Sequence, residues 1–95
     1  MNSNKVRSLI LTAIRHIERV RPGVVAWAYI DSGHWELSVN DFDFYMNDAT
    51  FKKLKELYRR LIGKLGVKIV FVCLMKPNAE ALYELELRNN LIMDC

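Results

Sequence analysis

The chain has 95 residues, 52% of them hydrophobic and 26% charged, and its formal net charge is +3. This length is typical of a single globular domain, 1–95, and the composition excludes an intrinsically disordered chain. All apolar runs are shorter than the ~20 residues that cross a bilayer, so no membrane association is predicted. Charged residues interrupt the N-terminal apolar positions, which argues against a signal peptide and leads us to expect a cytoplasmic location.

Charged residues are distributed in blocks along the chain. Residues 1–30 carry five basic residues and one acidic residue, 31–50 carry five acidic residues and no basic one, 51–76 carry eight basic residues and one acidic residue, and 77–95 carry one basic residue and four acidic ones. Separated blocks of opposite sign produce local fields that can steer a partner. The charge pattern therefore favours a function in binding.

The first predicted element is an amphipathic helix, which follows a capping segment at Asn2-Ser3-Asn4 and ends at Pro22-Gly23. Two strands are predicted next, over Val24–Ile30 and Trp35–Val39, with turn residues between them. The helix has one apolar stripe at helical spacing, made of Val6, Leu9, Ile10, Ala13, Ile14, Ile17 and Val20.

After the second strand the apolar phase shifts by one residue, to Phe42, Phe44 and Met46. A two-residue turn at Asn40-Asp41 explains the shift, because both residues tolerate the positive φ of a type I′ hairpin turn. We therefore predict a third strand over Phe42–Met46, paired antiparallel with the second. The alternative is an irregular loop that is capped into the following helix.

A second amphipathic helix is predicted to begin at a cap on Asn47 or Asp48 and to run to about Leu65. The next segment, Val67–Met75, is apolar except for Lys68 and rich in β-branched residues. Such a run predicts a strand buried on both faces, which the rest of the chain is expected to cover.

Residues 78–93 fit two patterns. Ala79–Leu87 is rich in helix formers, whereas Tyr83, Leu85 and Leu87 alternate with charged residues as in a strand. We predict a helix here, with a strand as the alternative. The predicted fold class is α+β, with a single mixed four-stranded sheet, the order α-β-β-β-α-β-α, and two amphipathic helices packed on one face of the sheet.

The opposite sheet face is predicted to display aromatic side chains rimmed by acidic ones. Such a patch marks a partner-binding surface or a face that the C-terminal segment or a second copy of the chain covers. The first functional hypothesis is a small non-enzymatic module that binds a protein partner, or itself, without a cofactor or a small-molecule ligand. Its predicted contact residues are Trp27, Tyr29, Glu36, Asp43 and Tyr45.

A second hypothesis is nucleic-acid binding through the basic face of the second helix. Six cations with one intervening acid could contact phosphates. As topology alone, the predicted order α-β-β-β-α resembles that of double-stranded RNA-binding domains, but their loop motifs are not present. The alternative is a solvated helix surface. The candidate residues are Lys52, Lys53, Lys55, Arg59, Arg60 and Lys64.

A third hypothesis is a metal-dependent nuclease that uses the acidic segment 31–48. Clustered carboxylates can hold Mg²⁺ for phosphodiester chemistry. As topology alone, the predicted order α-β-β-β-α-β resembles the core of restriction-endonuclease-like folds. Those enzymes need a lysine two residues after the acid of the third strand, whereas here Asp43 is followed at that position by Tyr45. No metal site is therefore assigned, and Cys73 and Cys95 form no metal motif. The segment contains Asp31, His34, Glu36, Asp41, Asp43 and Asp48.

Overall fold

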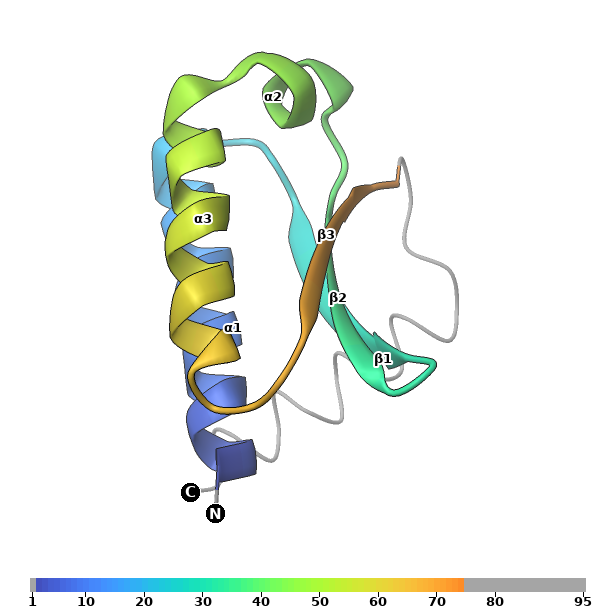
Figure 1. Ribbon diagram of the computed structural model, residues 1–95. Coiled ribbons are helices and arrows are strands. Elements are labelled where there is room, and N and C mark those ends of the chain that lie inside the picture. Colours follow the sequence, from blue (N-terminus) through green and yellow to red (C-terminus); the bar gives the residue numbers. More distant parts are fainter. Residues whose placement is uncertain (1, 75–95) are drawn as a thin grey trace.

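The computed structural model describes residues 2–74 as three helices and three strands (Figure 1). Within these residues, no helix combines the length and the hydropathy needed to cross a bilayer. The elements in chain order are α1 (Asn2–Val20), β1 (Ala26–Asp31), β2 (His34–Val39), α2 (Phe42–Asn47), α3 (Ala49–Gly63) and β3 (Ile69–Cys73).

The strands form one mixed sheet in the order β1-β2-β3. β1 pairs antiparallel with β2, and β2 pairs parallel with β3, so that Ala28, Leu37 and Phe71 lie in register across the sheet. Figure 1 shows α1 and α3 side by side over one face of this sheet. The fold is therefore α+β, with helices packed on a mixed sheet, as predicted.

The core fills the space between the helices and this sheet face. Helical spacing in α1 and α3 directs one apolar stripe of each helix to the sheet, and alternate residues of each strand meet it. Ser32 and Gly33 close the tight turn between β1 and β2 with φ values of 49° and 82°. The largest core side chains that are almost fully buried are Ile17, Leu37, Phe44, Phe51 and Ile62.

The predicted third strand is wrong, because residues 42–47 form the short helix α2. The Asp41 side chain caps this helix by accepting a hydrogen bond from the Phe44 backbone N–H at 2.9 Å. Phe44 is fully buried, whereas Phe42 is 64% exposed, so these two aromatic residues do not share a face as the hairpin would require. The alternative prediction, an irregular loop capped into the following helix, agrees with the structure in placing no strand here. It differs because the segment itself is helical.

The segment Val67–Met75 was predicted to be a strand buried on both faces. Within residues 2–74 it contains the strand β3, which lies at an edge of the sheet beside the central β2. Ile69 and Phe71 are buried against the helices, while Val70 and Val72 on the other face are half-buried. Without the predicted third strand, residues 2–74 contain three strands instead of the four expected. After β2 the chain passes through α2 and α3 and returns as β3, which pairs with β2. The helix predicted for residues 78–93, with a strand as its alternative, lies outside the described residues.

Candidate functional site

The aromatic sheet face differs from the predicted partner-binding surface at its main anchor. Trp27 is only 1% exposed, and Tyr29 and Glu36 beside it are half-buried. The Tyr29 hydroxyl donates a hydrogen bond to Glu36 Oε1 at 2.9 Å. Burial, with the nearby Glu36 and Asp31 carboxylates, raises the pKa of Tyr29 to about 12. A partner could therefore reach parts of Tyr29 and Glu36, but not the Trp27 ring.

Asp43 and Tyr45 lie away from these residues, because they belong to α2 and not to a strand of the sheet. The Tyr45 hydroxyl donates to the Phe71 backbone oxygen at 3.0 Å, and its ring lies 5.9 Å from that of Phe51. Asp43 accepts a hydrogen bond from the Asn47 side chain at 2.9 Å. The five predicted contact residues therefore do not form one surface.

The basic residues of the second predicted helix divide into two groups. Lys55 and Arg59 are engaged: Lys55 Nζ lies 4.9 Å from the centre of the Tyr45 ring, and Arg59 pairs with Glu56 at 3.0 Å. Burial, with the nearby cations Arg59 and Lys52, lowers the pKa of Lys55. The other four candidates are exposed, namely Lys52, Lys53, Arg60 and Lys64.

Helix α1 adds cations that the single-helix hypothesis did not include. It runs antiparallel to α3, since Arg21 after the end of α1 pairs with Asp48 before α3 at 3.5 Å, and Lys5 near the start of α1 lines the same groove as Lys64 after α3. The excess of basic residues in the first thirty positions was the sequence signal for this contribution. We define the basic surface as those exposed cations of both helices and of the turn after α3 that form no ion pair within residues 2–74: Lys5, Arg15, Arg19, Lys52, Lys53, Arg60 and Lys64.

The positive charge of the basic surface is largely uncompensated. Among residues 2–74, none of its seven cations takes part in an ion pair. The acids on α1 and α3 are Glu18 and Glu56, and Glu56 is paired with Arg59. Exposed cations gathered on one layer produce a local field that attracts anions.

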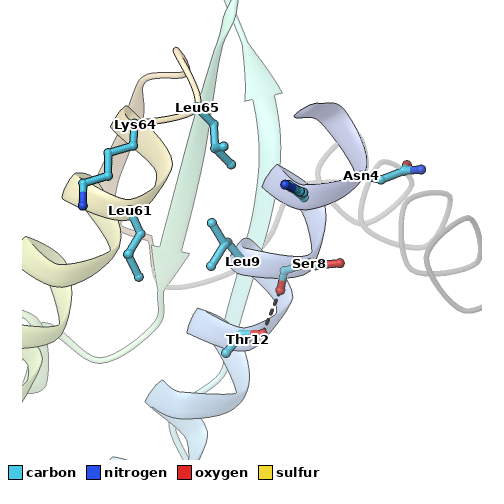
Figure 2. A pocket seen from close by; sticks show the side chains of 8 residues that line it. Asn4, Ser8, Leu9, Thr12, Leu61, Lys64 and Leu65 are labelled. Carbon is cyan, nitrogen blue, oxygen red and sulfur yellow. Dashed lines mark hydrogen bonds between the residues drawn. The ribbon is translucent and has the colours of Figure 1, made fainter. Parts of the chain in front are cut away.

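A groove of about 550 Å³ lies between α1 and α3 within the basic surface. Figure 2 shows Leu9 of α1 opposite Leu61 of α3 and Leu65, which together give the groove an apolar floor. Lys5 and Lys64 lie at its rim. The groove can therefore accept an apolar group that is attached to an anionic one.

The acidic segment separates into two parts. Asp41 and Asp48 are helix caps, accepting hydrogen bonds from the backbone N–H groups of Phe44 and Phe51 at 2.9 and 2.8 Å. At the other end of β2, ligand atoms of Asp31, His34 and Glu36 lie within 4.8 Å of one another. Two carboxylates and an imidazole could hold a divalent transition-metal ion there. The capping acids are already used in folding, and they are not part of this cluster.

Comparison of the chain with protein-family models, with curated proteins and with solved structures found no match.

Proposed function

We propose that this chain is a non-enzymatic binding module that binds nucleic acid through the basic surface of α1 and α3. The observation that supports this function is the antiparallel pairing of the two helices, whose layer carries seven exposed cations that have no ion pair within residues 2–74. Either helix alone would offer only part of this field. The protein-partner hypothesis loses its main anchor, because Trp27 is buried.

The dimensions of the basic surface suit a phosphate backbone. A helix of 15 residues such as α3 is about 22 Å long, which matches about six base steps at about 3.4 Å each. Lysine and arginine bind phosphates and release condensed counterions, so affinity is expected to fall steeply with salt. Contacts of this kind position a protein on nucleic acid without reading its sequence.

Binding is expected to tolerate different sequences. Among residues 2–74, the groove is lined by no aromatic residue, and between the helices Tyr58 is buried and the half-buried His16 ring contacts it, so no fully exposed ring is available there for a base to stack on. Specificity would then depend on backbone shape and charge. Duplex and single-stranded probes of equal length should therefore be compared at the same salt concentration.

The first test is fluorescence anisotropy with a labelled 20-base duplex and its single strand, from 50 to 300 mM salt. The double variant Arg60→Glu/Lys64→Glu is expected to weaken binding at least tenfold and to lower the salt slope by about two, roughly one for each lost phosphate contact. Both side chains are exposed, so the fold should be retained. Far-UV circular dichroism would verify this.

The matched control is Arg7→Glu/Lys68→Glu. It changes the net charge by the same amount as the first variant, at two positions outside the basic surface. Helical spacing places Arg7 away from α3, and the exposed Lys68 lies in the connection to β3. If both variants lose affinity equally, only the net charge matters and the proposed surface is wrong. Binding that does not respond to salt would contradict the nucleic-acid function altogether.

A second candidate function rests on the apolar floor of the groove. An amphipathic helix of a protein partner, with leucines on one face and acids beside them, could lie in this groove with its acids near Lys5 and Lys64. The probe is a designed helical peptide of leucine and glutamate heptads. Leu61→Ser is expected to weaken peptide binding tenfold and to leave duplex binding unchanged, and the opposite result would exclude the peptide.

A further inference from the structure

The sheet face opposite α1 and α3 contains buried residues that no described element covers. Trp27 and Ser38 are cross-strand partners on this face, with exposed fractions of 1% and 0%. The core between the sheet and the helices includes their neighbours Ala28 and Leu37 on the other face. Within residues 2–74, the helices all lie on that core side (Figure 1). Among residues 2–74, no helix or strand accounts for the burial of Trp27.

Two polar atoms on this face also lack partners. Trp27 Nε1 and Ser38 Oγ are buried and have no hydrogen-bond partner among the described residues. Buried donors of this kind are nearly always paired in folded proteins, because an unpaired donor loses its bond to water without replacement. The covering element is therefore expected to bring hydrogen-bond acceptors as well as apolar side chains.

We propose that residues 78–93 of the same chain cover the face formed by Trp27, Ser38 and Val72. These residues follow β3, whose Val72 lies in register with Ser38. Three strands span about 10 Å between their outer axes, and sixteen residues are long enough to cross that width in a helical or an extended conformation. The connection from β3 is short, so the effective concentration of this segment at the face is high.

The composition of residues 78–93 suits a segment that covers this sheet face. It supplies apolar side chains for the Trp27 ring and for Val72, and it supplies amide and carboxylate oxygens as acceptors for the Trp27 N–H and the Ser38 hydroxyl. The apolar members are Ala79, Ala81, Leu82, Tyr83, Leu85, Leu87, Leu91, Ile92 and Met93, and the acceptors are Asn78, Glu80, Glu84, Glu86, Asn89 and Asn90.

The test uses the full chain with Trp35→Phe, which leaves Trp27 as the single tryptophan. Acrylamide quenching and the emission maximum then report the exposure of Trp27. Light scattering gives the mass of the protein in the same samples, which form a dilution series over a hundredfold range of concentration. Strong protection of Trp27 in a monomer at every concentration is the expected result. A free, fully quenched indole would overturn the proposal, and so would protection that disappears on dilution together with a dimer, because a second copy would then be the cover.

A pair of variants identifies the covering segment. Leu82→Asp/Leu85→Asp is expected to raise the quenching constant of Trp27 several-fold and to shift its emission to the red, with far-UV circular dichroism retained. Arg88→Glu changes the net charge by the same two units at a residue that is in neither group, and it should change neither signal. If the leucine variant leaves Trp27 protected, residues 78–93 are not the cover. If that variant fails to fold, the dilution series on the chain with its native C-terminal segment still distinguishes cover by the same chain from cover by a second copy.

Discussion

The two faces of the sheet are buried in different ways. On one face, alternate strand residues such as Leu37 and Phe71 pack against two amphipathic helices, and the buried atoms are almost all apolar. On the other face, the buried pair is Trp27 and Ser38, and each side chain carries a polar atom that has no hydrogen-bond partner in the described part of the chain. The first face is a conventional core. The second face combines an aromatic ring with two polar atoms, which in folded proteins are nearly always hydrogen-bonded when buried.

The helix-covered face should respond most strongly to truncation of Phe44, the buried side chain of α2. Its ring centre lies 4.7 Å from that of Phe51, so Phe44→Ala removes aromatic contacts and leaves a cavity. We expect the free energy of unfolding to fall by about 3–5 kcal/mol. Urea denaturation would measure this change.

Phe42→Asp is the matched control for this comparison, and it also distinguishes the helix from the predicted strand. Phe42 is 64% exposed at the first position of α2, where an acid is favourable to the helix dipole. The variant should change the free energy of unfolding by less than about 0.5 kcal/mol. A loss as large as that of Phe44→Ala would mean that both rings face the core and would restore the hairpin.

The cap of α2 has an intermediate effect. Asp41→Ala removes the acceptor of the Phe44 backbone N–H, and it should lower the free energy of unfolding by about 1 kcal/mol. Asp41→Asn should recover most of this loss, because asparagine caps helices almost as well as aspartate. Urea denaturation of both variants is the measurement, and equal stability of the alanine variant and the original chain would contradict a capping role.

On the second face, the prediction concerns the titration of Tyr29. Its folded pKa of about 12 lies above the ordinary value of 10.0, so its neutral form stabilises the fold. This contribution is complete below about pH 10, and it is lost as the pH rises from about 10 to about 12. The difference in absorbance at 295 nm between the chain and its Tyr29→Phe variant isolates this titration.

Glu36→Gln tests the origin of the shift. Loss of the carboxylate removes two of the causes that raise the pKa of Tyr29 and leaves its burial, the largest cause. The titration should therefore move part of the way towards the ordinary value of the phenol. An unchanged midpoint would assign the raised pKa of Tyr29 to its burial and to the Asp31 carboxylate.

Much of the local structure could be predicted from the sequence. The amphipathic period predicted α1 and α3, and Ser32-Gly33 between alternating runs predicted the turn from β1 to β2. The segment after β2 was harder, because Asn40-Asp41 is suitable both for a hairpin turn and for a helix cap. Phe42, Phe44 and Met46 alternate with polar residues or tyrosine, which favoured a strand. In the structure only Phe44 of these three is buried, and its packing stabilises a short helix beside α3.

The candidate site was predictable only in part. Exposure of Lys52, Lys53, Arg60 and Lys64 follows from the helical period of α3, and the structure agrees. Their grouping with Arg15 and Arg19 of α1 depends on how two helices distant in the sequence pack together. The involvement of Lys55 with the Tyr45 ring depends on α2, which the sequence pattern did not identify.

The sequence by itself determined which residues face the core within each long helix, because the apolar period is a local property of the chain. It also determined the basic character of α1 and α3, which is a matter of composition. Among residues 2–74, only the tertiary structure decided that β2 is the central strand, that residues 42–47 coil into a helix, and that Lys5 of the first helix and Lys64 after the third line one groove. These outcomes depend on contacts between distant segments, whose free energies exceed the small local preferences that a sequence pattern reveals.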